Sequence, residues 1–537
     1  MHFSSLFLAH IVRYANFAEQ IRSNMKFKAF LQSHGSRLSH ALFFLLAWWW
    51  ASWWMGDFFR IAYENSFFTT DSTIMHSLWQ KPYGSLWILG RAALTLYHWP
   101  LLGGLVIALL LSVGSWLVGY CLRLRPRWRW LQWLPAGAWM AWNAWLGFNV
   151  YFQFEPGRTF GVLVLVVAIC AIDAFIIWTF KSKHHHAVQP TPVLSHILAV
   201  LVIIAAVAIP SLITQLRHPY VRPVTRMQVQ MLHEDWQGMV QTAHDHATLS
   251  YRPLAAFYAI ALVHTGRLAE DLFDIRLDFD TLYVVGRNKQ PNIGTDLYLI
   301  DCDYTAGLFR SAEHKAVEHL TMDGPTLFSL KHLTRLALLD HNWALARKYL
   351  DIISAAPFES AFIERYTPMV GSEEAVESDP NFALLRKGEP VIDGLESFFE
   401  PPTFLGYHAV NTKGRSQEAL IYSVMTNLYS KRMPAFLERC SPFVGTTPPR
   451  LIAEGLVTQS VKNPAIMEAF PQLQMAQQAY KGFLQNVSYA VKDRPTYARQ
   501  LFDQYKGYYP YYYFFGNLKS TRKRDNKEAG TSSAGVN

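Results

Sequence analysis

The sequence predicts an all-α protein, with about five transmembrane helices followed by a soluble array of helical hairpins. Sixteen of the 18 tryptophans precede Leu216, whereas most of the Asp and Glu residues follow it. The part before Leu216 also holds several nearly charge-free apolar stretches of membrane-spanning length. Because tryptophan prefers the headgroup level of a bilayer and carboxylates avoid its core, this division indicates a membrane part joined to an aqueous part.

Five apolar stretches, each of about 20 residues, are the predicted spans of a domain covering residues 38–216. They cover residues 39–59, 99–120, 131–152, 159–180 and 193–216. The segment 86–97 is also apolar, and it could form an extra span or lie along or re-enter the membrane. Residues 1–37 carry basic side chains without a cleavage site for a signal peptidase, so we predict a cytoplasmic lead-in.

Basic residues predict the orientation, because Lys and Arg concentrate in cytoplasmic loops. Eleven of them fall on the side of the N-terminus, including the four arginines of the loop 123–129, and seven fall on the opposite side. We therefore expect a multi-pass protein of a cell membrane, of the bacterial inner-membrane type. Its N-terminus should be cytoplasmic and its C-terminal domain extracytoplasmic, unless 86–97 forms an extra span and inverts everything after it.

The region 217–516 is predicted to be a helical-repeat domain. One face of the helix predicted for 340–355 is apolar at three- and four-residue steps, Asn342 or Asp340 can cap its start, and Leu327–Leu339 precedes it as the other half of a hairpin. Further pairs are Val229–Ala243 with Pro253–His264, Leu297–Phe309 with Ala312–Leu320, Glu418–Tyr429 with Met433–Cys440, and Gln474–Val487 with Pro495–Tyr505. Such pairs are similar to tetratricopeptide repeats without a strict period, and the tail 517–537 is predicted to be disordered.

The order of these features resembles an uncharacterised family of bacterial multi-pass envelope proteins with a tetratricopeptide-like C-terminal domain. Three segments carry the resemblance, which covers nearly the whole chain. They are FFTTDSTIMHSLWQKPYG from Phe67, LARKYLDII from Leu345 and YYPYYYFFG from Tyr508. The resemblance implies an architecture and offers no activity.

Acidic residues supply the candidates for catalysis and metal binding. Asp57, Glu64 and Asp71 lie in or next to the first predicted extracytoplasmic loop, where polytopic enzymes that act on lipid-linked sugars place carboxylates. Asp301 and Asp303 form a D-x-D pair, with which many nucleotide-sugar transferases bind a divalent ion at the end of a strand. The flanks of this pair favour a helix, so we predict neither a metal nor a cofactor.

Histidines and cysteines give no established motif. Two histidine groups, 184–186 and 244–246, are interpreted as solvated loop or turn residues. His314, Glu318 and His319 have a spacing one residue longer than that of the inverted zinc-protease motif, which favours a surface helix. Free buried thiols are favoured for Cys302 and Cys440, although a disulfide between them stays open.

The sequence favours a non-enzymatic membrane protein whose helical-repeat domain binds a protein or a surface polymer. The expected partners are the lipid bilayer and another protein. Nucleic acid is not expected, because much of the positive charge flanks apolar segments. The alternatives are an enzyme acting on lipid-linked sugars and a transporter that uses Asp173, a carboxylate inside the span 159–180.

Overall fold

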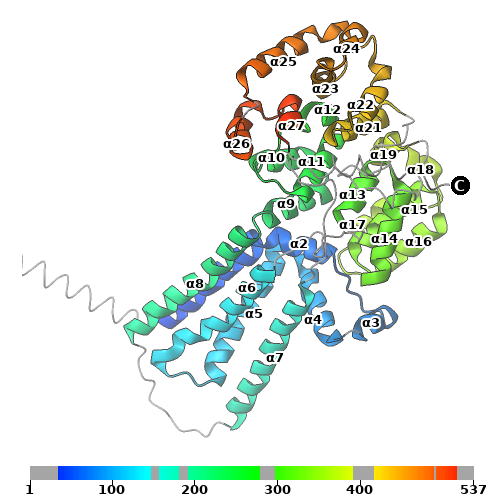
Figure 1. Cartoon of the computed structure of the whole chain (residues 1–537). Helices are drawn as coiled ribbons and strands as arrows, with labels where there is room; N and C mark the ends of the chain where they lie inside the picture. Colours follow the sequence, from blue (N-terminus) through cyan, green and yellow to red (C-terminus); the bar gives the residue numbers. More distant parts are fainter. Residues whose placement is uncertain are drawn as a thin grey trace, which may run out of the picture. The chain divides into compact units, whose positions relative to one another are not determined.

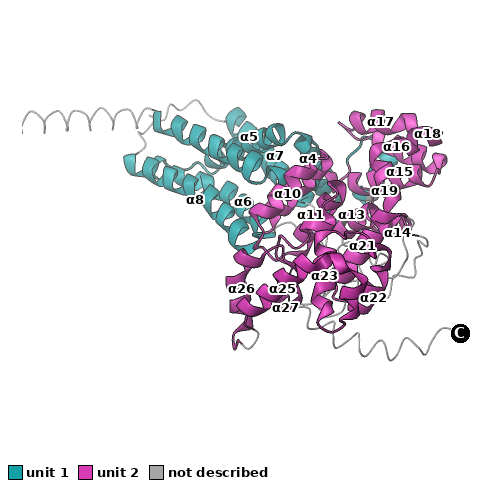
Figure 2. Ribbon diagram, turned by 90° about the horizontal axis from the view of Figure 1, so that it is seen from above, with its two compact units in different colours: residues 1–63, 68–147, 155–219 teal, residues 64–67, 148–154, 220–537 magenta. Residues whose placement is uncertain are grey.

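The computed structural model of the protein describes residues 34–80, 82–146, 156–180, 192–277, 297–390, 416–488 and 491–516. The elements of these ranges are helices, and no β-strand occurs among them (Figure 1), which confirms the all-α class. The chain forms two compact units, coloured separately in Figure 2. Most of the predicted lead-in 1–37 and all of the predicted tail 517–537 lie outside the described residues.

Unit 1 contains the described residues of Met1–Tyr63, Phe68–Gly147 and Glu155–Pro219. Its first described helix covers 34–49 and continues into the π-helical turn η1, Trp50–Trp54. The remaining elements are α2 Gly56–Glu64, whose last residue counts with unit 2, α3 Ser72–Trp79, α4 Gly84–Leu94, η2 Thr95–His98, α5 Pro100–Cys121, η3 Pro126–Trp133, α6 Leu134–Leu146, α7 Gly157–Phe180 and α8 Val193–Arg217.

Three helices of unit 1, namely α5, α7 and α8, are long and apolar enough to cross a membrane. They coincide with three of the five predicted spans. Large apolar side chains are exposed along them, for example Ile172, Phe175 and Trp178 on α7. Exposing such an apolar surface to lipid costs much less free energy than exposing it to water. The surface is therefore compatible with a location in a membrane.

The other apolar stretches differ from the continuous spans that their hydropathy predicts. The stretch 39–59 is interrupted at Met55, where the helix that began before η1 ends and α2 begins. The stretch 131–152 begins in η3 and continues in α6, and its residues 147–152 lie outside the described residues. The segment 86–97 falls on α4 and η2, and the 11 residues of α4 are too short to cross a bilayer alone.

Glycines allow α4 and α7 to pack with their backbones in contact. A Cβ added to Gly90 would overlap the carbonyl oxygen of Gly157, and one added to Gly161 would overlap the carbonyl oxygen of Leu86. Helices without a hydrophobic driving force between them associate through such close approaches of small residues. The two glycines of α7 are four positions apart, so they lie on the same face of that helix.

An interhelical hydrogen bond joins α6 to α7. Asn143 is fully buried, and its side-chain oxygen accepts a hydrogen bond of 2.6 Å from the Thr159 hydroxyl. The amide nitrogen of Asn143 donates to the Trp139 carbonyl at 2.9 Å. Asn143 therefore stabilises the contact between two helices by satisfying polar groups in an apolar setting.

Unit 2 contains Glu64–Phe67 and the described residues from Tyr220 onward. Its helices in chain order are α9 Val221–Leu232, α10 Trp236–Asp245, α11 Arg252–His264, α12 Leu268–Asp271, α13 Leu297–Thr305, α14 Phe309–Asp323, α15 Leu327–Leu339, α16 Trp343–Ser354, α17 Ser360–Tyr366, η4 Thr367–Met369, α18 Glu373–Glu377 and α19 Pro380–Gly388. They continue as α21 Gln417–Tyr429, α22 Met433–Arg439, η6 Ser441–Phe443, α23 Arg450–Ser460, α24 Ala465–Ala469, η7 Pro471–Leu473, α25 Gln474–Asn486, α26 Arg494–Tyr505 and α27 Tyr509–Phe515.

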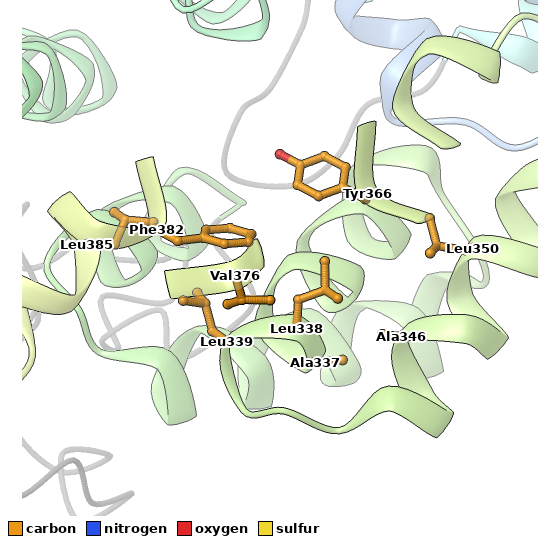
Figure 3. Packing of buried hydrophobic residues seen from close by; sticks show 9 residues of the cluster. All are labelled: Ala337, Leu338, Leu339, Ala346, Leu350, Tyr366, Val376, Phe382 and Leu385. Atoms are coloured by element: carbon orange, nitrogen blue, oxygen red, sulfur yellow. The ribbon is translucent and has the colours of Figure 1, made fainter. Parts of the chain in front are cut away.

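The predicted pair 327–339 and 340–355 is present as the hairpin of α15 and α16, which pack against each other. Asn342 caps α16 as expected, because its side chain accepts a hydrogen bond of 3.2 Å from the Leu345 amide. Figure 3 shows the core that this hairpin shares with α17, α18 and α19. Its buried residues are Ala337, Leu338, Leu339, Ala346, Leu350, Tyr366, Val376, Phe382 and Leu385.

The other predicted hairpins are present in part. Helices α10 and α11, α13 and α14, and α21 and α22 pack as neighbouring pairs. The single helix predicted for Val229–Ala243 is wrong, because α9 ends at Leu232 and α10 begins at Trp236. Glu234 between them adopts a left-handed backbone with φ of 56°, and Asp235 caps α10 by accepting a hydrogen bond from the Gly238 amide.

We expect Gly90→Leu to destabilise unit 1 strongly, because any side chain at this position collides with the backbone of α7. The measurement is the thermal unfolding temperature of the detergent-solubilised full chain. Gly56→Ala is the control, since a Cβ there would meet Pro100 Cβ at 3.4 Å and the Ala51 carbonyl oxygen at 3.9 Å, both ordinary contacts. Equal unfolding temperatures for the two variants would contradict the close packing of α4 on α7.

Candidate functional site

A cavity of about 100 Å³ lies in unit 2 beside α15, and we call it the α15 pocket. Side chains of α9, α10, α11, α13, α15, α17 and α19 line it, together with Glu64. Its volume is about two-thirds of that of an engineered cavity, about 150 Å³, that binds benzene. The pocket can therefore hold several water molecules or one small group of a ligand.

Helix α15 supplies the polar side of the pocket. Thr326 caps it by accepting a hydrogen bond of 3.1 Å from the Ser329 amide, and nearly every residue of the helix is buried. Three basic residues interrupt its apolar sequence, Lys331, His332 and Arg335. Positions three and four residues apart share a helix face, so Arg335 lies close to both of the others.

Lys331 is held by two buried carboxylates. Its Nζ lies 2.8 Å from Glu64 and 2.9 Å from Glu359, and the side chains of both acids are less than 5% exposed. A buried ammonium needs such compensation, because removing it from water costs several kcal/mol. Lys331 therefore has a structural role in these two ion pairs.

His332 and Asp301 face each other across the pocket lining. The imidazole Nε2 lies 2.9 Å from Asp301 Oδ1, and both side chains are at most 6% exposed. Because a carboxylate only accepts hydrogen bonds, Nε2 is the donor of this pair. The remaining atoms, Asp301 Oδ2 and His332 Nδ1, are buried without a hydrogen-bond partner among the described residues.

Arg335 has no carboxylate at ion-pair distance among the described residues. Its Nε donates a hydrogen bond of 3.2 Å to the Tyr366 hydroxyl, and its guanidinium lies over the rings of Phe362 and Tyr366 at 5.4 and 5.7 Å. The two Nη groups of Arg335 have no hydrogen-bond partner among the described residues. Because a guanidinium has five N–H donors, most of its capacity is open.

Aromatic side chains form the apolar side of the pocket. Trp236 and His264 both line it and stack with ring centroids 3.7 Å apart. Burial lowers the pKa of His264 to about 4, so its ring is neutral near pH 7. Phe328 and Tyr304 meet the His332 ring edge to face at 4.6 and 5.3 Å.

Glu234 lines the pocket, and one of its hydrogen-bond partners is Arg365. Its carboxylate accepts a hydrogen bond of 2.6 Å from Arg365. Burial alone would raise the pKa of Glu234, but the contacts with Arg365 and Asn381 lower it below its usual value. Glu234 is therefore ionised at neutral pH, and Arg365 binds it directly while the charge of Arg335 stabilises it from a greater distance.

The three candidate catalytic carboxylates have different roles and do not form one site. Glu64 belongs to unit 2 and is bound to Lys331 in a buried ion pair. Asp57 lies in the first turn of α2 and Asp71 before α3, both in unit 1. Asp71 is exposed, and its Oδ1 accepts a hydrogen bond of 2.8 Å from the Thr73 amide.

The D-x-D pair lies on a helix, α13, and its two carboxylates have separate partners. Asp301 contacts His332, whereas Asp303 accepts a hydrogen bond of 2.7 Å from Ser311 and forms an ion pair with Lys315. Among the described residues no group of three or more His, Cys, Asp and Glu side chains could hold a metal ion. A metal site at Asp301 and Asp303 therefore has no support in this geometry.

The other residues that the sequence singles out as candidates have local partners or lie outside the described residues. His244 lies 3.1 Å from the Tyr258 hydroxyl, and His319 of α14 is fully buried against Ser329. Asp173 lies on an exposed face of α7. Cys302 and Cys440 are buried and free, and the histidines 184–186 lie outside the described residues.

The basic residues of α15 are not among the sites that the sequence predicts, although the chain contains a signal for them. Lys331, His332 and Arg335 stand inside LFSLKHLTRLALL, an otherwise apolar segment. Charged side chains in the middle of a buried helix are costly, so they indicate either buried partners or a ligand. Their partners come from distant segments, which the sequence alone does not identify.

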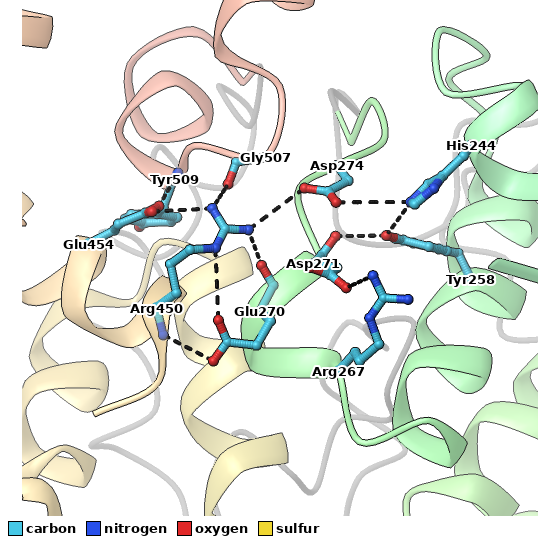
Figure 4. Close-up of polar contacts among 10 residues, drawn as sticks. All are labelled: His244, Tyr258, Arg267, Glu270, Asp271, Asp274, Arg450, Glu454, Gly507 and Tyr509. Carbon is cyan, nitrogen blue, oxygen red and sulfur yellow. Dashed lines mark hydrogen bonds and ion pairs between the residues drawn. The ribbon is translucent and has the colours of Figure 1, made fainter. Parts of the chain in front are cut away.

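A second polar cluster of unit 2 is shown in Figure 4, and we call it the Arg450 cluster. Arg450 donates to the Gly507 carbonyl at 2.8 Å and lies 3.2 Å from Glu454 and 3.8 Å from Glu270. The other oxygen of Glu454 accepts a hydrogen bond of 2.8 Å from the Tyr509 amide. These contacts join α12, α23 and the start of α27, so the cluster is a structural connection with its partners in place.

The fold and the pocket together define the class: an all-helical protein with helices suited to cross a membrane and a polar pocket in its second unit. The chain belongs to a family of unknown function, DUF6057, whose model matches residues 158–516. No curated protein and no solved structure matches the chain.

We expect Lys331→Met to lower the free energy of unfolding of unit 2 by about 3–5 kcal/mol, because it leaves two buried carboxylates without their shared cation. Proteolysis of the detergent-solubilised full chain across a urea series measures this loss. Lys387→Met is the matched control, since Lys387 is exposed and lies 3.6 Å from an exposed Glu418. The control should change the free energy by less than about 1 kcal/mol, and a similar loss in both variants would contradict the role of Lys331.

The Arg450 cluster should make stability depend on pH through Glu454. Burial raises the pKa of Glu454 to about 7, although Tyr509 and Arg450 act in the opposite direction. Since the folded pKa exceeds the unfolded value of 4.5, this group contributes stability that is present below pH 4.5 and lost as the pH rises through about 7.

Glu454→Gln mimics the protonated side chain and should remove this contribution. The free energy of unfolding of the variant, relative to the wild type, should therefore rise between pH 4.5 and 7. Urea denaturation at a series of pH values measures the difference. Glu468→Gln, at an exposed position, should follow the wild type at every pH, and a flat difference for Glu454→Gln would refute the assignment.

Proposed function

We propose that this protein is a membrane-anchored binding protein without enzymatic activity, whose second unit binds a group of a partner protein in the α15 pocket. The observation that carries the proposal is the open polar capacity of the pocket, at Asp301 Oδ2, His332 Nδ1 and the Arg335 guanidinium. Each buried polar atom without a partner costs about 1–3 kcal/mol. A ligand that supplies the missing hydrogen bonds recovers this free energy on binding.

The proposed membrane anchor consists of about five spans. Three of them are the apolar helices α5, α7 and α8, and the other two are the stretches 39–59 and 131–152. The three apolar helices support it by their length and composition. The distribution of Lys and Arg supports a cytoplasmic N-terminus, and with it a helical domain on the outer face of a bacterial inner membrane. The succession of packed hairpins supports a tetratricopeptide-like array, an architecture that commonly binds partners.

The size of the pocket favours a protein partner over a surface polymer. About 100 Å³ suits one small side chain or a chain end. A sugar ring with its hydroxyl groups needs more room. The mixture of charged and aromatic walls also fits an amino-acid residue, which presents polar backbone groups next to an apolar side chain.

The alternative of an enzyme that acts on lipid-linked sugars has less support. Such an enzyme needs an ionised carboxylate open to its substrate, whereas Glu64 is buried and bound by Lys331. Asp71 already accepts a hydrogen bond from the Thr73 amide at the start of α3. Transport through Asp173 has less support as well, because this carboxylate lies on an exposed face of α7 with the side chain of Cys121 as its hydrogen-bond partner.

Photo-crosslinking from the pocket tests the proposal. A photoreactive amino acid replaces Phe328, which lines the pocket and is only partly buried, in the full chain expressed in its host cells. The matched control places the same amino acid at Val317, which is exposed on α14 and outside the pocket lining. We expect a discrete protein adduct from position 328 that position 317 does not give.

A pocket variant makes this test specific. Combining the photoreactive residue at 328 with Arg335→Met should abolish the adduct, because it removes the open guanidinium and leaves the membrane unit unchanged. An adduct that contains carbohydrate instead of protein would replace the protein partner by the surface polymer. Identical adducts from 328 and 317, or none from 328, would refute binding in the pocket.

A further inference from the structure

Resting on the proposed function, we infer that the α15 pocket binds a terminal amino-acid residue: a carboxylate whose α-carbon carries an N–H donor. Two sources present this chemistry, a free α-amino acid and the last residue of a polypeptide. Arg335 binds the carboxylate, and Asp301, which His332 holds in place, accepts a hydrogen bond from the nitrogen.

The acceptor side follows from the geometry of the His332 and Asp301 pair. Nε2 of His332 donates to Asp301 Oδ1, which leaves Asp301 Oδ2 as an open acceptor and His332 Nδ1 on the opposite side of the ring. Both atoms are buried and without a partner among the described residues, in side chains that are at least nine-tenths buried. The open oxygen of Asp301 selects an N–H donor, and the negative charge of the carboxylate favours an ammonium further.

The donor side is the guanidinium of Arg335. Lys331 is excluded from this role, because Glu64 and Glu359 already bind its ammonium. The Nη groups of Arg335 have no partner in the described part of the chain, and their fork matches the two oxygens of a carboxylate. The carbonyl or carboxylate oxygens of a ligand would complete the set of hydrogen bonds that the Tyr366 hydroxyl begins.

The spacing of the two sides fits one residue. His332 and Arg335 are three positions apart on α15, so their Cβ atoms are separated by about 5–6 Å on the same face. The amino nitrogen and the carboxylate of one amino acid are joined by a single carbon and fit between such side chains. Phe328 and Phe382 at the pocket then provide an apolar surface for a small side chain.

Ligands that carry only one of the two charges fit less well. A phosphate would be repelled by Asp301 and by Glu234, which also lines the pocket. A simple amine would leave the Nη groups of Arg335 without a hydrogen-bond acceptor.

Binding of three small probes to the full chain in detergent micelles tests the inference by calorimetry or saturation-transfer NMR. The probes are L-alanine, N-acetyl-L-alanine and L-alaninamide. We expect at least one of the two acids to bind, and the amide to bind at least about tenfold more weakly, because it cannot form the charge-assisted hydrogen bonds to Arg335. Comparable affinity for both acids identifies the end of a polypeptide, and binding of alanine alone identifies a free amino acid.

Variants assign the binding to the named residues. Arg335→Met should reduce the affinity for the acids to that for the amide, and Arg335→Lys should keep part of it, because it retains the charge without the fork. Asp301→Asn should weaken L-alanine more than N-acetyl-L-alanine, since only the former carries an ammonium. Arg310→Met is the matched control, because Arg310 is exposed, pairs with Asp340 and lies outside the pocket lining.

The outcomes separate this inference from the proposed function. The inference is overturned if the amide binds as well as the acids, if Arg335→Met and Arg310→Met behave alike, or if none of the probes binds at millimolar concentration. A protein adduct from position 328 that persists in those cases leaves the partner-binding function standing with another ligand chemistry. Loss of the adduct with intact probe binding would instead leave a small-molecule site without a protein partner.

Discussion

Burial of Lys331 and His332 on one helix, next to a half-buried Arg335, is the constraint on which unit 2 depends. Helix α15 is buried along nearly its whole length, and water cannot solvate the charges that it carries. Lys331 requires Glu64 and Glu359, and His332 requires Asp301. These requirements fix the positions of α13 and of the start of α17 around α15, and they attach the segment 64–67 to unit 2.

The sequence predicted those elements whose signals are local. The hairpin of α15 and α16 follows from an apolar stripe and from the Asn342 cap, and both operate within one turn of the chain. The break between α9 and α10 was missed, because Glu234 adopts a left-handed backbone without a glycine to indicate it. Hydropathy located α5, α7 and α8, but it does not mark the interruption at Met55, where apolar residues continue on both sides.

The α15 pocket could not be predicted, because its residues converge from distant segments. Lys331 and Glu64 are 267 positions apart, and no local pattern relates them. The sequence indicates a different chemistry for the D-x-D pair, the binding of a divalent ion. Residues two apart on a helix point in directions about 200° apart, so Asp301 and Asp303 face separate partners, and only Asp301 reaches the pocket.

Charged groups of unit 2 divide into two kinds, and the division is an argument for a ligand. Lys331 and the Arg450 cluster are closed, since carboxylates or carbonyl oxygens bind their cations. Asp301, His332 and Arg335 are open on the side of the pocket, in a cavity polar and large enough for water to enter. A group that replaces this water gains free energy only if it satisfies both the acceptors and the guanidinium, because satisfying one side alone leaves the other desolvated. Selectivity for a residue that carries both a carboxylate and an N–H group then follows from the pocket itself, before any contact that the rest of a partner adds.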